Sequence, residues 1–240
     1  MAIITNPNFD ASPARLAQCR AALNADTTPL PRPLVILGGW RAWSISPLSA
    51  RRVLAPLLPA GTPTVPVIAY PFSGSFEHAG RVVRDRLARA NLLDTPIDIV
   101  AISMGGLLAR WLALRGELSI ARLFTLATPH RGAHLARFIA PDKAARAMRE
   151  GSPLLRELDA ALPQATYTLT CYAALRDWWV HARNTSPPGL HPYWVDPTTI
   201  LGRLFSHFAI NANAAIHTDI ALRLRGLPPL AVEPSQPPIN

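Results

Sequence analysis

Short runs of strand-like composition alternate with longer segments of helical periodicity along most of the chain. The runs that predict strands lie at 34–37, 64–70, 97–102, 121–127 and 166–172. The segments that predict helices lie at 12–24, 47–57, 76–91, 107–114 and 214–225. This alternation predicts an α/β fold with a doubly wound, mostly parallel sheet, in which ligands bind above the carboxyl ends of the strands.

Three segments depart from this alternation. Residues 133–161 have the character of helices interrupted at Pro141 and at 151–153. Residues 173–206 hold many aromatic residues, prolines and asparagines, which predicts a long functional loop. The tail, 228–240, carries five prolines and is predicted to be an extended or disordered surface segment.

The strand-like run 97–102 passes directly into a turn that carries a serine. Ser103 lies two residues after Ala101 and two residues before Gly105, and a helical segment follows from Leu107. A serine between small residues in a strand–turn–helix unit is typical of the nucleophile elbow, where the hydroxyl projects above the sheet. The common motif has glycine at the position of Ala101, so a buried strand followed by an ordinary turn stays an alternative.

Two further motifs follow predicted strands. Gly38-Gly39-Trp40 comes after the run 34–37, and Thr128-Pro129-His130 comes after the run 121–127. Because the carboxyl ends of parallel strands lie at one edge of a sheet, we expect both turns on the same rim as Ser103.

The composition is typical of one globular domain. The chain has 240 residues, 49% of them hydrophobic and 16% charged, with a mean hydropathy of +0.15. We therefore expect residues 1–240 to form a single α/β domain with a full core. The sequence has no His, Cys, Asp and Glu cluster with metal-ligand spacing, so we expect neither a metal nor another cofactor.

The formal net charge of +9 comes almost wholly from arginine, since Lys143 is the only lysine. The arginines are dispersed along helical segments and form no basic tract, as in Arg81, Arg84, Arg86 and Arg89. This pattern predicts a solvated helix face and no nucleic-acid site, while weak peripheral contact with an anionic membrane stays an alternative.

Cys19 and Cys171 are too few for a disulfide framework, and we expect free thiols in a reducing compartment. The first residues lack the basic and long apolar regions of a secretory leader, and no apolar run approaches the length of a membrane span. We expect a cytoplasmic protein.

The chain resembles the α/β-hydrolase superfamily, and within it the bacterial lipase and esterase group that includes proteins similar to glycosyl-phosphatidylinositol inositol-deacylases. The segments that carry the resemblance are 34–40, 102–106, 126–132 and 148–158. The most specific of them is Ala127-Thr128-Pro129-His130-Arg131-Gly132. The chain departs from the family where Gly38-Gly39 replaces the usual His-Gly, and where Ala101-Ile102 replaces the usual Gly-His before the serine.

The resemblance implies a catalytic triad in the chain order Ser103, Asp177, His207, which is the order of α/β-hydrolases. It places the acid after the run 166–172, with Asp196 as the alternative, and the base in the loop before the last helix. His217 is the alternative base, but it falls within that helix. The resemblance also implies that His130 is structural.

The resemblance further implies that the backbone amides of Trp40 and Met104 form an oxyanion hole. For Met104 this also follows from geometry, because the residue after the nucleophile presents its amide to the hole. The fold commonly inserts a cap at the position of 133–161, and the apolar residues there favour a lid over a lipophilic pocket. Packing of the same residues against the sheet stays an alternative.

These features predict a serine esterase or lipase that cleaves a small-molecule or lipid ester through an acyl-enzyme. A thioesterase, an amidase or an acyltransferase could use the same residues. From a different class, a catalytically silent binding protein with a hydrolase fold stays an alternative, because the residues flanking Gly39 and Ser103 depart from the family.

Overall fold

Six parallel strands form one sheet in the computed structural model, which describes residues 3–41, 45–62 and 67–239. The strands are β1 (Leu34–Leu37), β2 (Val67–Ile68), β3 (Ile97–Ile102), β4 (Ile120–Leu126), β5 (Thr168–Ala174) and β6 (Tyr193–Val195). Their order across the sheet is β2-β1-β3-β4-β5-β6, and every neighbouring pair is parallel. The chain order reverses at β1, so the crossovers place helices on both faces, as the sequence predicts.

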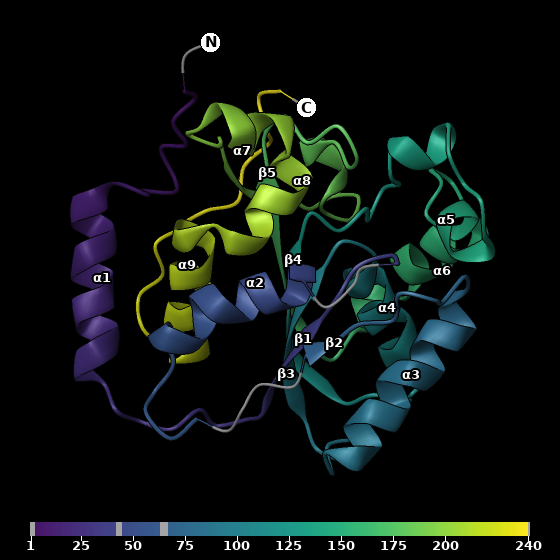
Figure 1. The fold of residues 1–240 in the computed structure, drawn as a ribbon, viewed down its shortest axis with the longest axis horizontal. Coiled ribbons are helices and arrows are strands. Elements are labelled where there is room, and N and C mark those ends of the chain that lie inside the picture. The colour runs from purple at the N-terminus through teal and green to yellow at the C-terminus, as the bar shows by residue number, and fades with distance from the viewer. Residues whose placement is uncertain (1–2, 42–44, 63–66, 240) are drawn as a thin grey trace.

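The longer helices lie on both faces of this sheet (Figure 1). They are α1 (Pro13–Ala25), α2 (Ile45–Leu54), α3 (Phe76–Arg89), α4 (Met104–Leu114), α6 (Pro153–Ala161) and α9 (Ala214–Leu224). Shorter helices are α5 (Lys143–Ala147), α7 (Ile200–Leu204) and α8 (Ser206–Ala209), with 3-10 turns at Ala55–Leu57, Leu135–Arg137, Leu162–Gln164, Ala182–Asn184 and Ile210–Ala212.

The strands are apolar on both faces because each face has its own helical cover. Val100 and Ile102 of β3 pack in one core cluster with residues of α1, α2 and α9. Ile99 and Ala101 of the same strand pack in a second cluster with residues of α3, α4 and α6. Alternate side chains of a strand point to opposite faces, so a strand covered on both sides is a continuous apolar run.

The sequence predicts several helix ends correctly. Ser12 caps α1, where its hydroxyl accepts a hydrogen bond from the Arg15 amide at 3.4 Å, and proline occupies the first helical position. Asn213 caps α9 through the Ile216 amide at 3.1 Å, and Gly226 follows that helix with a φ of 68°. These contacts are local, which explains why the sequence suffices to place them.

The prediction of one long loop over 173–206 is wrong. The segment contains the edge strand β6, in which Trp194 pairs with Ala173 of β5, and it also contains the short helix α7. A strand of three residues is too short to produce a periodic pattern, and its position is set by pairing with β5. The predicted strand at 64–70 is reduced to β2, and its first residues lie outside the described part of the chain.

The proline-rich tail is extended, but it packs on the domain. Leu230 and Ala231 are buried, and the amide of Ala231 donates to Asp219 Oδ1 at 2.8 Å. Ala231 also forms an antiparallel bridge with Phe9 near the other end of the chain. The expectation of a disordered surface segment is therefore wrong for this part of the tail.

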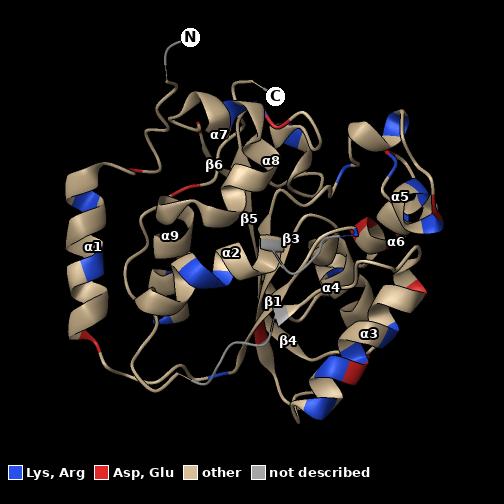
Figure 2. Ribbon diagram, viewed as in Figure 1, with Lys and Arg blue, Asp and Glu red and all other residues tan. Residues whose placement is uncertain are grey.

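The predicted solvated arginine face lies on α3, whose arginines are among the ribbon segments coloured blue (Figure 2). Arg81, Arg86 and Arg89 are exposed, whereas Val83 and Leu87 of the same helix are buried. Both cysteines are free and buried. Within the described ranges, no helix has the length and apolar character needed to cross a bilayer.

A buried carboxylate holds the sheet together at the end opposite the Ser103 turn. Asp98 of β3 is fully buried and accepts hydrogen bonds from Arg32 Nε at 3.1 Å and Arg122 Nε at 3.0 Å. Arg122 also donates to the carbonyls of Arg223 and Leu224 at the end of α9, at 2.7 and 3.1 Å. One ion network thus joins β3, β4 and α9.

We expect Asp98→Ala to lower the free energy of unfolding by about 3 kcal/mol, because removing one partner of a buried ion pair leaves the other uncompensated. Urea unfolding followed by circular dichroism measures the change. Asp94→Ala, at an exposed turn a few residues upstream, is the control and should change stability by less than about 0.5 kcal/mol. Equal losses in the two variants would contradict this role for Asp98.

Candidate active site

Ser103 occupies a strained turn between β3 and α4. Its φ is 50° and its ψ is −124°, a conformation that L-residues rarely adopt. Its amide donates to the Leu126 carbonyl at 2.8 Å, and its carbonyl accepts from Thr128 Oγ1 at 2.7 Å. The turn is therefore fixed from the neighbouring strand β4, and strain persists at such a position only when the surroundings hold it.

The space around this turn explains the small residues near the serine. A Cβ on Gly105 would lie 2.5 Å from the Gly38 carbonyl oxygen, and a Cβ on Gly106 would collide with the Thr128 side chain. Ala101 is fully buried, but its methyl group packs in the core cluster under α3 and α4. Glycine is therefore required after the serine, whereas the alanine that departs from the common motif is accommodated.

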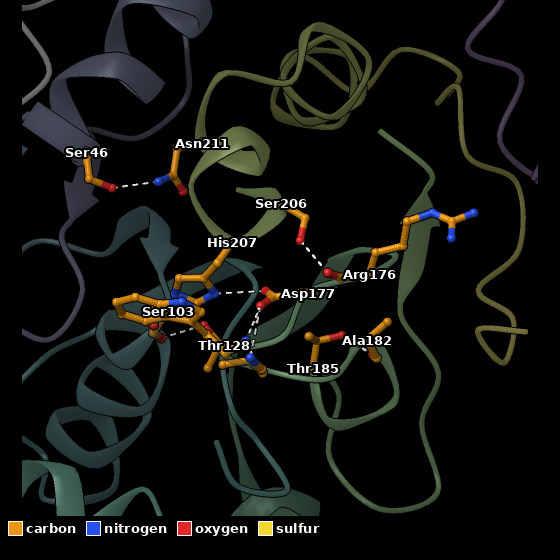
Figure 3. A network of polar contacts seen from close by, with 12 residues as sticks. Ser46, Ser103, Thr128, Arg176, Asp177, Ala182, Thr185, Ser206, His207 and Asn211 are labelled. Carbon is orange, nitrogen blue, oxygen red and sulfur yellow. Dashed lines mark hydrogen bonds and ion pairs between the residues drawn. The ribbon is translucent and has the colours of Figure 1, made fainter. Parts of the chain in front are cut away.

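Ser103, His207 and Asp177 form one chain of hydrogen bonds (Figure 3). Ser103 Oγ lies 3.2 Å from His207 Nε2, and His207 Nδ1 lies 2.8 Å from Asp177 Oδ2. A carboxylate only accepts hydrogen bonds, so Nδ1 carries the proton of the neutral ring and Nε2 is free to accept from the serine hydroxyl. The three residues come from the start of α4, from α8 and from the loop after β5.

The orientation of the histidine and of the aspartate is fixed by further contacts. Asp177 is buried, and its Oδ1 accepts from the amides of Trp179 at 2.8 Å and Val180 at 3.0 Å. The Trp179 ring stacks on the His207 ring, with centroids 5.3 Å apart and planes 14° apart. Ser206 Oγ donates to the Arg176 carbonyl at 2.8 Å, which ties α8 to the loop after β5. The imidazole is thus held before any substrate binds.

The two alternative assignments lie elsewhere. Asp196 pairs with Arg176 Nε at 3.0 Å and accepts from the Ile4 amide at 2.9 Å. His217 is buried within α9, and its Nε2 donates to the Asn211 carbonyl at 2.8 Å. Within the described part of the chain, neither Asp196 nor His217 forms a hydrogen bond with Ser103.

His130 is held within the turn that follows β4. Its Nδ1 lies 2.9 Å from Arg110 Nη1, and its Nε2 lies 3.2 Å from Thr125 Oγ1. A guanidinium only donates, so Nδ1 accepts and Nε2 carries the proton. Burial, together with Arg110 and Arg131, holds the pKa of His130 well below its usual range. The ring therefore stays neutral and holds the Thr128–Gly132 turn in place.

Arg110 is the residue that sequence reasoning missed. It is 1% exposed on α4, and besides His130 it donates to the Leu158 carbonyl of α6 at 2.6 Å. The available signal was a single arginine within the otherwise apolar helix 104–114. Because a lone charge on an apolar helix has to be paired when the helix is buried, such an arginine predicts a buried contact.

The two residues expected to supply oxyanion amides, Met104 and Trp40, lie next to the serine in sequence and at the cavity wall, respectively. Met104 is the first residue of α4, and the first amides of a helix have no intrahelical partner. Trp40 follows Gly39, where a Cβ would lie 3.1 Å from the Ser103 Cβ. The use of both amides as an oxyanion hole stays a prediction.

A mostly apolar cavity of about 480 Å³ opens above the serine. Ser103 and His207 line it together with Leu135, Ile139 and Met148. Its polar lining is confined to a few residues, among them Ser46, Ser49 and Asn211. Asn211 Nδ2 donates to Ser46 Oγ at 2.6 Å, at some distance from the triad in the view of Figure 3.

The segment 133–161 divides into two parts. Its first part, with Leu135, Ile139 and Met148, lines the cavity, as expected of a cap. Its second part is α6, which buries Leu155 and Leu158 in the core cluster that contains α4. The segment therefore contributes both to the cavity wall and to the core, and its role as a cap or mobile lid stays a prediction.

No group of three or more metal-ligating side chains occurs within the described ranges. No protein-family model matches the chain, and no curated protein sequence matches it. The similarity to known proteins therefore comes from solved structures.

Three solved structures illustrate that similarity. Mature lipase BlEst2 from Bacillus licheniformis aligns with a TM-score of 0.58 at 14% identity, over 84% of this chain and 94% of that chain. The metagenomic carboxyl esterase MGS0156 aligns with a TM-score of 0.57 at 14% identity, over 83% and 77%. Phospholipase PlaB from Legionella pneumophila aligns with a TM-score of 0.50 at 13% identity, over 64% of this chain and 45% of that chain.

The chain thus spans less than half the length of the Legionella protein. At these identities the likeness concerns the fold. The sheet order, the strained serine turn and these neighbours agree: this chain has the α/β-hydrolase fold.

The buried His217 predicts a pH dependence of stability. Burial lowers its pKa from 6.5 to about 4, and its Nδ1 has no hydrogen-bond partner within the described structure. The unfolded chain therefore binds this proton more readily than the folded chain. The stability that His217 contributes is fully present above pH 6.5 and is lost as the pH falls toward 4.

We expect His217→Gln to flatten the fall in unfolding free energy between pH 6.5 and 4, because glutamine has no proton to gain. Urea unfolding at several pH values measures the slope. His191→Gln, at an exposed position, should keep the wild-type slope. A slope in His217→Gln identical to that of the wild type would overturn the attribution of this pH dependence to His217.

Proposed function

We propose that this protein is a serine hydrolase of carboxylic esters, with Ser103 as nucleophile, His207 as general base and Asp177 as the residue that orients the base. The observation that carries the proposal is the chain of hydrogen bonds from Ser103 Oγ through His207 to Asp177, at the base of an apolar cavity. The 3.2 Å from Ser103 Oγ to His207 Nε2 falls within the range expected for a nucleophile and its base. The 2.8 Å from His207 Nδ1 to Asp177 Oδ2 is within hydrogen-bond reach of the group that orients the base.

The reaction is an acyl transfer in two steps. Ser103 Oγ attacks the ester carbonyl carbon while His207 Nε2 takes the hydroxyl proton, and the tetrahedral intermediate places its negative oxygen at the amides of Trp40 and Met104. The intermediate collapses when His207 returns the proton to the departing alkoxide, which leaves as an alcohol. Water, deprotonated by His207, then attacks the acyl-serine carbonyl carbon. His207 returns this proton to Ser103 Oγ as the acyl–oxygen bond breaks, and the carboxylic acid leaves the restored enzyme.

The lining of the cavity favours an ester with an apolar acyl group. Side chains such as Leu135, Ile139 and Met148 offer no hydrogen bonds to a polar substituent, and burial of hydrocarbon beside them stabilises binding by roughly 0.8 kcal/mol for each methylene group. The structural neighbours are named as a lipase, a carboxyl esterase and a phospholipase, which agrees with a lipid or other apolar ester.

Several narrower statements belong to this proposal. The likeness to glycosyl-phosphatidylinositol inositol-deacylases rests on the sequence segments 34–40, 102–106, 126–132 and 148–158, and it stays a prediction. The single-domain organisation with a cap at 133–161 and the cytoplasmic location also stay predictions. Weak contact with an anionic membrane surface stays an alternative that liposome binding tests.

The test of the proposal is hydrolysis of p-nitrophenyl esters from acetyl to palmitoyl. We expect Ser103→Ala and His207→Ala each to lower kcat at least about 10³-fold, because nucleophile and base act as one unit. Asp177→Asn should lower kcat about 10⁴-fold, because an amide at this position favours the wrong imidazole tautomer. His191→Ala, at an exposed histidine, is the control and should retain wild-type activity.

Labelling by a fluorophosphonate separates catalysis from a silent fold. An activated Ser103 reacts with the reagent, and Ser103→Ala abolishes the reaction. A wild-type chain that hydrolyses no ester and resists the label would overturn the proposal in favour of a binding protein. Turnover of thioesters or amides in preference to esters would keep the triad but change the substrate class.

A further inference from the structure

The carboxylate of Asp142 joins the cap to the loop that carries a proposed oxyanion donor. Asp142 caps α5, where its Oδ1 accepts from the Ala145 amide at 2.8 Å. The same carboxylate accepts from Trp40 Nε1 at 3.1 and 3.2 Å and from Arg41 Nε at 2.9 Å. Three donors from two distant parts of the chain thus converge on one side chain.

The loop at Trp40 needs such an anchor because its backbone departs from regular structure. Gly38 is still tied to the sheet, since its amide donates to the Ile68 carbonyl at 2.9 Å. Arg41, three residues later, has a φ of 47°, which is strained for a residue with a long side chain. The side chains of Trp40 and Arg41 both donate to Asp142, so the carboxylate stabilises the loop beyond the end of the strand.

The two contacts differ in strength. The Arg41 side chain is 52% exposed, and an exposed ion pair contributes little to stability. The indole of Trp40 is half-buried, and the Asp142 side chain is 11% exposed, so their bond is a charge-assisted hydrogen bond with limited access for water. We therefore expect the Trp40 bond to account for most of the effect.

We propose that Asp142 is a positioning residue for ester hydrolysis, which holds the Trp40 amide in the oxyanion hole through the Trp40 side chain. The inference rests on the proposed function. It makes the cap segment part of the apparatus that stabilises the transition state, in addition to its place in the wall of the cavity. A small displacement of the amide would weaken the hole, because oxyanion donors act only from a fixed position.

A residue that only caps a helix would not need the contacts that Asp142 makes with Trp40 and Arg41. Ser152 caps the next helix, α6, through the Leu155 amide at 3.3 Å, and its hydroxyl donates to the Ala147 carbonyl within the same segment. Asp142 has the same capping role at α5, yet its carboxylate also reaches across to Trp40 and Arg41. This difference gives a variant that separates the two roles of Asp142.

Asp142→Ser retains a residue that caps helices well but is too short to reach the indole. We expect its kcat for p-nitrophenyl esters, per fluorophosphonate-titrated site, to fall about 10- to 100-fold, with KM changed less than about threefold. Trp40→Phe, which keeps the ring and loses the N–H, should give a similar fall, and the double variant should fall no further. Ser152→Ala is the control and should stay within about threefold of the wild-type kcat.

Hydrogen exchange provides a second readout that does not depend on turnover. We expect faster exchange at the peptide covering 38–41 in Asp142→Ser and unchanged exchange there in Ser152→Ala. Full kcat per titrated site in Asp142→Ser, or equal exchange in the two variants, would overturn the role of Asp142 while leaving the proposed function intact. A wild-type chain that neither hydrolyses esters nor reacts with the fluorophosphonate would overturn both.

Discussion

The close approach of β3 and α4 at Ser103 is the constraint on which the rest of the site depends. The strand and the helix meet with no room for a side chain at Gly105 or Gly106, and the serine between them adopts a positive φ. A relaxed turn would direct the hydroxyl elsewhere. Two hydrogen bonds hold the strained conformation: the Ser103 amide donates to the Leu126 carbonyl, and the Thr128 hydroxyl donates to the Ser103 carbonyl. The elbow therefore requires an intact sheet.

The surrounding structure stabilises this arrangement through buried polar groups. Asp98 joins β3, β4 and α9 below the site, and Arg110 joins α4 to the turn at His130 and to α6. Backbone strain is concentrated at the other end of the strands, where Arg41, Ser103, Ala127 and Arg176 all have positive φ values. Each of these four residues follows a strand, which is the edge where an α/β sheet binds ligands.

The cavity above the serine is formed by segments that are far apart in sequence. Its wall includes parts of the loop after β1, of the segment 133–148, of the loop after β5 and of α8. The contacts of Asp142 show how such segments depend on one another, since one carboxylate bonds both α5 and the loop after β1. The shape of the cavity above Ser103 thus depends on contacts between several loops.

The family resemblance, and not any local pattern, led to Asp177 and His207. The sequence by itself determined the fold class, most helix and strand positions, and the serine turn. These depend on local periodicity, on caps such as Ser12 and Asn213, and on small residues whose spacing allows one backbone geometry. Only the tertiary structure decided the edge strand β6, the packed tail at Ala231 and the buried role of Arg110. Such features arise from pairing between residues far apart in the chain, whose energies leave no periodic trace in the sequence.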